Sequence, residues 1–253
     1  MSIAALRSAT ALSWLSLFAA VLAAWALLYA MAIPTDIRDA SRVFGTDFWE
    51  SLCAVTPDLA GYGRLVLMWA LMAIAMMLPT AAPAFVAYRD LSASGAATRP
   101  VTLALGFLGV WWGFAVAASL LQMALFRADL VSSFGDSRSA QLSAMLLLAA
   151  GAYQFSAYKA ACLHKCRAPV SFFLQHWDKG PFRMGLLMGL TCLGCCWALM
   201  LLAFVGGVMS LTFMSVATLI MTLEKLPRIG RWLDRPLGVV LIAVAGLVAV
   251  LGV

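Results

Sequence analysis

Charged side chains are scarce in this sequence. Lysine, arginine, aspartate and glutamate together make up 11% of the 253 residues, whereas hydrophobic residues make up 64%. Soluble domains carry about 25% charged residues, so this composition excludes a water-soluble globular protein. With a mean hydropathy of +0.97, the chain is predicted to be an integral membrane protein, and the lipid bilayer is its first expected partner.

The sequence also lacks the patterns of several enzyme classes. It has no nucleotide-binding motif, no paired carboxylates spaced for acid–base catalysis and no nucleophile–base triad. No carboxylate lies deep in an apolar segment, so a proton relay through the bilayer is not expected. An enzymatic activity is therefore not the leading interpretation. The formal net charge of +6 does not indicate nucleic-acid binding, because the basic residues lie in loops between apolar segments.

The apolar segments predict an all-α fold, a polytopic transmembrane helical bundle of about seven spans. They form one integral membrane domain over residues 1–253. The predicted spans are residues 9–33, 65–88, 100–126, 139–158, 184–205, 208–223 and 237–253. Gly206-Gly207 separates the fifth span from the sixth and predicts a tight turn within a helical hairpin.

The basic residues predict an orientation. Twelve Lys and Arg residues lie in the N-terminus and in alternate loops, and five lie on the opposite side. The positive-inside rule places the N-terminus in the cytoplasm and the C-terminus outside a bacterial cytoplasmic (inner) membrane. Residues 34–63 then form an acidic outer loop, and residues 65–253 form a six-span core. Segment 9–33 is predicted to be a retained span or signal anchor; cleavage after Ala30-Met31-Ala32 would leave six spans.

Three cysteines fall within five residues of the fifth predicted span, in the motif Cys-Leu-Gly-Cys-Cys-Trp over residues 192–197. On a helix that turns by about 100° per residue, Met188, Cys192, Cys195 and Cys196 share one face. Four sulfur atoms on one side of a helix suit a soft metal such as Cu(I). Because Cys195 and Cys196 are adjacent, one ion is expected to take Cys192 and one of these two, with further ligands from another helix.

Two further sulfur-rich segments precede this motif. Cys162 and Cys166 are four residues apart and share a helix face if the fourth span continues past the membrane surface. Along the second span, Met68, Met72 and Met76 form a row of thioethers. Since these donors run from the cytoplasmic surface into the bilayer, they predict a relay of several moderate sites. Helix packing is the alternative interpretation, because cysteine and methionine both fill apolar interiors.

Other polar or sulfur-bearing residues are expected to have structural roles only. Glu224 and Lys225 close the sixth span and are predicted to be snorkelling anchors at the membrane surface. Residues 172–178 are predicted to form a short interfacial helix, on which His176 is a surface residue. Cys53 stands alone in the outer loop and is predicted to be unpaired.

The three sulfur segments, in this order, resemble a bacterial family of predicted metal-binding integral membrane proteins, a domain of unknown function. The matching residues are Met68-Trp69 with Met76-Met77-Leu78-Pro79, Tyr158-Lys159 with Cys162 and Cys166-Arg167-Ala168-Pro169, and Gly189 through Cys192-Leu193-Gly194-Cys195-Cys196-Trp197 to Met200, followed by Gly207, Met209, Met214 and Glu224-Lys225. The resemblance covers about residues 60–230 and implies a multi-span helical fold and a bound metal. Members of that family often have His where this chain has Met188, and a thioether there favours Cu(I) over Zn(II).

The leading hypothesis is therefore a membrane protein that binds Cu(I) and either transports it or delivers it for cuproprotein assembly. A cuproprotein or a metallochaperone is its expected protein partner. The predicted ligands are Cys192, Cys195, Cys196, Cys162, Cys166, Met188, Met72, Met76 and Met68. Two alternatives remain: a thiol–disulfide oxidoreductase coupled to quinone, because Cys192 and Cys195 have redox spacing, and a structural or assembly subunit with packing cysteines.

Overall fold

The computed structural model describes residues 3–32, 58–92, 99–132 and 135–252, and this part of the chain forms helices and no β-strand. The predicted all-α fold is therefore confirmed for these residues. In chain order the helices are α1 (Ile3–Ala32), α4 (Leu59–Ser92), α5 (Pro100–Arg127), α6 (Ala140–Gln154), α7 (Ala157–Arg167), α8 (Pro169–His176), the 3-10 helix η1 (Trp177–Lys179), α9 (Gly180–Leu201), α10 (Ala203–Gly206), α11 (Leu211–Lys225) and α12 (Gly230–Leu251). Most of the predicted outer loop, including Cys53, lies outside the described residues.

Four stretches of the described helices are long and apolar enough to cross a membrane, which is compatible with a multi-pass membrane protein. They are Leu59–Leu91, Pro100–Arg127, Pro169–Gly206 and Gly230–Leu251. The prediction of about seven spans is not confirmed. Helices α6 and α11 have 15 residues each, and at 1.5 Å per residue they are shorter than the roughly 30 Å hydrocarbon core. Helix α1 has 30 residues and contains the apolar stretch Leu15–Met31.

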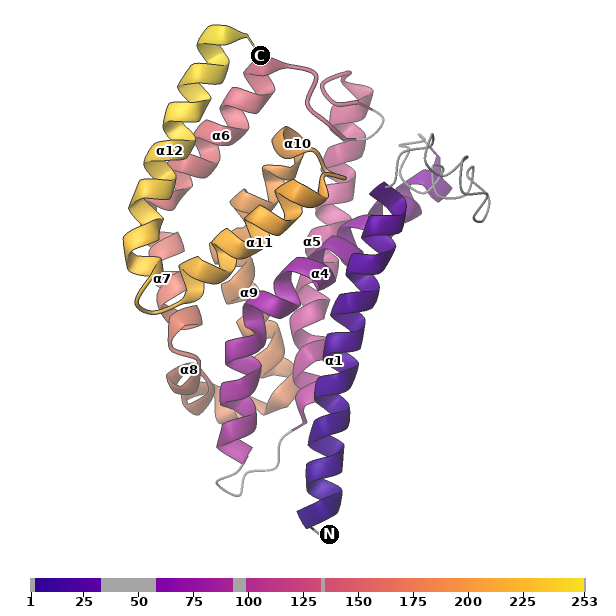
Figure 1. Ribbon diagram of the computed structural model, residues 1–253, viewed down its shortest axis with the longest axis vertical. Helices are drawn as coiled ribbons and strands as arrows, with labels where there is room; N and C mark the ends of the chain where they lie inside the picture. The colour runs from indigo at the N-terminus through magenta and orange to yellow at the C-terminus, as the bar shows by residue number, and fades with distance from the viewer. Residues whose placement is uncertain (1–2, 33–57, 93–98, 133–134, 253) are drawn as a thin grey trace.

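The helices are arranged with α6 beside α12 on one side and α1 beside α4 on the other, and α11 runs obliquely between them (Figure 1). Helix α11 packs against α4, α12, α7 and α9. Gly207 has a φ of 92°, which confirms the turn predicted at Gly206-Gly207. The hairpin is open, however, because α10 intervenes and α11 packs more extensively on α4 than on α9.

The fourth predicted span, 139–158, does not continue as one helix to Cys166, although Cys162 and Cys166 do lie on one helix, α7. Helix α6 ends at Gln154, and the Ser156 hydroxyl accepts a hydrogen bond from the N–H of Lys159, which begins a new helix. Helix α6 packs mainly against α12, whereas α7 packs mainly against α9. Because of this interruption, α7 packs against α9 and brings Cys162 and Cys166 beside the helix that bears the cysteine motif.

Helices α5 and α9 approach each other closely through glycines. A Cβ atom on Gly185 would lie 2.1 Å from the carbonyl oxygen of Leu103, and one on Gly106 would lie 2.2 Å from that of Phe182. Such distances leave no room for a side chain, as is common where membrane helices pack on small residues. This contact holds the first half of α9 against α5. The cysteines follow in the second half of α9, which also contacts α7 at Gly194.

Helix α4 continues through Pro79 and Pro83, and α1 compensates for one of them. Pro79 has no N–H to pair with the carbonyl of Ala75, four residues earlier. The indole Nε1 of Trp25 donates a hydrogen bond to that carbonyl at 3.0 Å. A proline within a membrane helix is tolerated where a neighbouring helix pairs the freed backbone group, and α1 does so here.

We expect Trp25→Phe to lower the free energy of unfolding by about 1–3 kcal/mol, because it leaves the Ala75 carbonyl unpaired in an apolar interior. Equilibrium unfolding of the detergent-solubilised protein measures this change. Trp232→Phe is the matched control, since Trp232 is 84% exposed and its loss should have little effect. Equal stability of the two variants would contradict a structural role for the indole N–H.

Candidate metal centre

The three thiols of the cysteine motif converge in the structure. The Sγ atoms of Cys192, Cys195 and Cys196 all lie within 4.8 Å of one another, and each of the three residues is at most 2% exposed. The Sγ atoms of Cys195 and Cys196 are 3.3 Å apart. Although these two residues are adjacent in sequence, one turn of α9 brings both sulfur atoms beside Cys192. The group therefore offers three soft donors to one ion.

Helix α7 adds a fourth thiol, from the half-buried Cys166. Its Sγ atom lies 3.9 Å from the Sγ atom of Cys195. The close approach of α7 to α9 depends on Gly194, because a Cβ atom there would lie 2.6 Å from the Sγ atom of Cys162. The hydroxyl of Tyr153 also donates a hydrogen bond to the carbonyl of Gly194. The glycine inside the motif thus lets a second helix place a thiol at the cluster.

Cys162 and Cys166 occupy different surroundings on α7, which lies outside the four candidate spans. Cys162 is buried against Gly194, and burial raises the pKa of its thiol. The pKa of the Cys166 thiol is lowered, first by its hydrogen bond with Cys195 and then by the positive charges of Lys225 and Arg167. Of the two thiols, that of Cys166 therefore loses its proton more readily.

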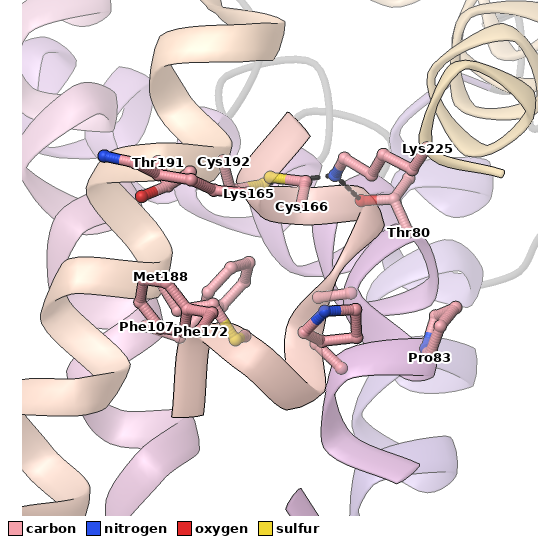
Figure 2. Close-up of a pocket in the computed structure, with 13 residues that line it drawn as sticks. Thr80, Pro83, Phe107, Lys165, Cys166, Phe172, Met188, Thr191, Cys192 and Lys225 are labelled. Atoms are coloured by element: carbon pink, nitrogen blue, oxygen red, sulfur yellow. Dashed lines mark hydrogen bonds between the residues drawn. The ribbon is translucent and has the colours of Figure 1, made fainter. Parts of the chain in front are cut away.

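Lys225 lies at the cluster rather than at the membrane surface, so its prediction as a snorkelling anchor is wrong. The residue is 9% exposed. Its Nζ atom donates to the Sγ atom of Cys192 at 3.1 Å and to the Oγ1 atom of Thr80 on α4 at 2.6 Å. Figure 2 shows both hydrogen bonds, with Lys225 placed between Thr80 and Cys192. A cation therefore contacts one of the thiols directly.

Glu224 is also buried rather than anchored at the surface, which corrects the second half of that prediction. Its carboxylate is 0% exposed and accepts hydrogen bonds from the Nζ atom of Lys159 at 2.9 Å and 3.0 Å. The side chain of Lys159 is itself 1% exposed. The pair joins α7, which carries Cys166, to α11, which carries Lys225. It therefore links two of the helices that build the cluster.

A cavity of about 40 Å³ adjoins the thiols. Its sulfur-bearing walls are Cys166, Met188 and Cys192, and its cations are Lys165 and Lys225. Figure 2 shows Met188 below Cys192 at this cavity. One water needs about 10–15 Å³ measured in this way. The space thus suits an ion with a few waters rather than a bulky organic complex.

The predicted methionine row is buried but does not line this cavity. Met68, Met72 and Met76 are each 1% exposed in the core along α4. The row runs along α4 toward the thiol cluster, however, because Thr80 follows Met76 by one helical turn. Thr80 lines the cavity and accepts a hydrogen bond from Lys225. Of the predicted ligands, the structure brings Cys192, Cys195, Cys196 and Cys166 together and places Met188 on the cavity wall. Cys162 and the three methionines lie outside that group.

Three functional candidates were missed by sequence reasoning: Lys225, Thr80 and the buried pair Lys159–Glu224. One signal for Lys225 is present in the sequence, since Met214, Thr218, Met221 and Lys225 follow one another on one helix face. Met214 and Met221 are buried. Because Lys225 lies on the same helix face, its burial could have been expected from theirs. Lys159, Glu224 and Lys225 also stand among the residues that carry the family resemblance. No comparable pattern marks Thr80.

The donor set is rich in sulfur. His164 is exposed, and the Nδ1 atom of His176 makes a hydrogen bond to the carbonyl of Phe172 at 2.8 Å. Neither imidazole lines the cavity. Thiol and thioether donors without imidazole or carboxylate suit soft metals, copper among them. The residues present therefore fit copper.

Comparison with known proteins supports this assignment. The model of the PpoB2 family, described as copper chaperone, matches residues 66–248. No curated protein and no solved structure matches the chain. The matched region contains the buried cluster of Cys192, Cys195 and Cys196, and family and cluster together fit copper binding or delivery. Because the match covers more than half of its length, the chain belongs to the PpoB2 copper chaperone family.

Proposed function

We propose that this protein binds Cu(I) at the thiol cluster and delivers it to a cuproprotein during assembly. The observation that carries the proposal is the meeting of two helices at one group of thiols. Helix α9 supplies three sulfur atoms within 4.8 Å of one another, and α7 places the Cys166 sulfur 3.9 Å from Cys195. In this proposal two of the three thiols of Cys192, Cys195 and Cys166 hold the ion at any one time, with Cys196 and Met188 as neighbouring donors.

The cluster suits a metal that is passed on. Four thiols meet at the cluster, so the ion can exchange one soft thiolate ligand for another without leaving the protein. The half-buried Cys166 and the exposed Lys165 lie on the wall of the adjoining cavity. An incoming or outgoing donor would therefore meet Cys166 first. The buried thiols on α9 would hold the ion between these exchanges.

The methionine row on α4 provides a second group of soft donors. Met76 precedes Thr80 by one turn, and Met72 and Met68 continue the row away from the cavity. Thioethers bind Cu(I) and discriminate against harder ions. We propose that these buried residues are weaker sites along the route by which Cu(I) reaches or leaves the cluster. The description of the family as copper chaperone favours delivery over release across the membrane.

Reconstitution into vesicles tests delivery against transport and against redox chemistry. Protein loaded with Cu(I) under reducing conditions is placed in liposomes that contain a Cu(I)-sensitive dye. We expect copper to stay with the protein until a thiol-rich Cu(I) acceptor is added outside, and the five described cysteines to stay reduced throughout by thiol trapping.

Filling of the vesicle lumen faster than in protein-free liposomes would instead identify a transporter. Formation of a disulfide among the cluster thiols, with electrons passed to added quinone, would support the oxidoreductase. Failure of the reduced protein to retain copper at all would overturn the proposal.

A further inference from the structure

The buried charges around the cluster do not balance. Lys159 and Glu224 form a neutral pair, and beside them Arg167 pairs with Asp234 at 2.8 Å. Among the described residues, no carboxylate forms an ion pair with Lys225. Since Lys165 is exposed, the buried groups described at the cluster carry one uncompensated positive charge, that of Lys225, when the thiols are protonated.

A buried ammonium group without a counter-ion is costly, because removal from water must be offset by an opposite charge or strong hydrogen bonds. One partner of Lys225 is the hydroxyl of Thr80, which remains neutral. The Thr80 hydroxyl donates its own hydrogen to the carbonyl of Met77 at 3.0 Å, so its oxygen is free to accept from Nζ. The other partner is Cys192, and the thiols are the nearby groups that can become anionic.

We infer that Lys225 is the counter-ion of the bound copper and thereby selects a univalent metal. This inference rests on the proposed function. One Cu(I) held by two thiolates carries a net charge of −1, which the ammonium of Lys225 balances. On binding, two S–H bonds are replaced by two Cu–S bonds, and the two protons leave to water. The centre then changes from one excess positive charge to neutrality without any oxidation or reduction.

The same charge disfavours a divalent ion. Zn(II) held by two thiolates is neutral, so the charge of Lys225 would remain uncompensated beside it. Reaching balance would need a third thiolate and therefore the loss of one more proton from the cluster than Cu(I) requires, and zinc usually also takes a fourth ligand in tetrahedral geometry. Thr80 and Cys192 hold the ammonium from opposite sides, from α4 and α9 (Figure 2). Lys225 is accordingly a positioning and selectivity residue rather than a metal ligand.

The test is the affinity for Cu(I) and for Zn(II) of wild type and Lys225 variants, measured in detergent by competition with chromogenic chelators. For Lys225→Met we expect Cu(I) affinity to fall by at least about thirtyfold, as when one partner of a buried charge pair is truncated. Zn(II) affinity should be unchanged or higher, because no excess positive charge remains. Lys225→Arg keeps the charge and should retain most of the Cu(I) affinity. Lys179→Met, the same change at an exposed lysine that does not line the cavity, should leave both affinities as in wild type.

The outcomes separate this inference from the proposed function. If wild type binds Cu(I) and Lys225→Met binds it equally well, the counter-ion role is overturned while the copper site stands. Equal losses of Cu(I) and Zn(II) affinity would show a structural role for the lysine and overturn the inference too. Absence of Cu(I) binding by wild type would overturn both. Should Lys225→Met fail to elute as a folded species, Thr80→Val replaces it: we expect a smaller, selective loss of Cu(I) affinity, and no loss would contradict the inference.

Discussion

Replacing Cys192 and Cys195 together with serine is expected to remove copper from the purified protein. Each hydroxyl is a hard donor that Cu(I) binds poorly, and the double variant leaves Cys166 without its sulfur neighbour at 3.9 Å. Loss of groups that merely support metal ligands costs about 10–100-fold in affinity. Loss of two ligands should therefore exceed a hundredfold. Elemental analysis after growth with copper, with purification under reducing conditions, measures the result.

Cys162→Ser is the matched control for this experiment, since it makes the same chemical change on α7. Cys162 is packed against Gly194 and does not line the cavity. We expect that variant to retain copper and to lose stability only modestly. Copper retained by the double variant would instead mean that the cluster thiols pack helices and that the metal is bound elsewhere. Loss of copper from Cys162→Ser alone, with the fold intact, would return Cys162 to the ligand set.

Glu224→Gln is expected to have the largest effect on stability. The substitution removes the carboxylate partner of the Lys159 ammonium, and the Lys159 side chain is only 1% exposed. Breaking a buried ion pair by removal of one partner costs about 3–5 kcal/mol. Because the pair links α7 to α11, we also expect Cys166 and Lys225 to be held less firmly and copper affinity to fall. The unfolding transition of the protein in detergent gives the first quantity, and chelator competition gives the second.

The double variant Lys159→Met/Glu224→Met separates charge from packing. Replacing a whole buried ion pair with apolar side chains is often neutral or stabilising, so the double variant should recover most of the lost stability. A double variant as unstable as the sum of the two single variants would rule out pairwise compensation. Wild-type stability of Glu224→Gln alone would show that Lys159 finds another partner or loses its charge.

The all-helical fold was predictable from the scarcity of charge and the long apolar segments. A chain with so few charges must satisfy its backbone hydrogen bonds internally within lipid, and helices do so locally. The number of spans was not predictable from apolar segments alone. An apolar segment such as 139–158 indicates burial, and it does not reveal that Ser156 begins a new helix after Phe155. Because a new helix begins there, α7 does not continue along α6 but packs against α9.

The cysteine cluster was predictable because helix periodicity places residues 188, 192, 195 and 196 on one face. Its other components were not, since they depend on which helices meet. Lys225 resembled a surface anchor because a charged residue at the end of an apolar segment usually reaches water. Its burial follows from the oblique packing of α11 against α4, which brings Thr80 to its Nζ atom. Glu224 is buried for a related reason, because Lys159 lies opposite it on α7.

X-ray absorption at the copper edge of the copper-loaded, reduced protein tests the central claim most directly. Binding at the thiol cluster predicts Cu(I) with sulfur as its only nearest neighbours, and this signal should disappear in the Cys192→Ser/Cys195→Ser variant. Oxygen or nitrogen neighbours around the copper, or an unchanged spectrum in that variant, would contradict a Cu(I) site built from α9 and α7.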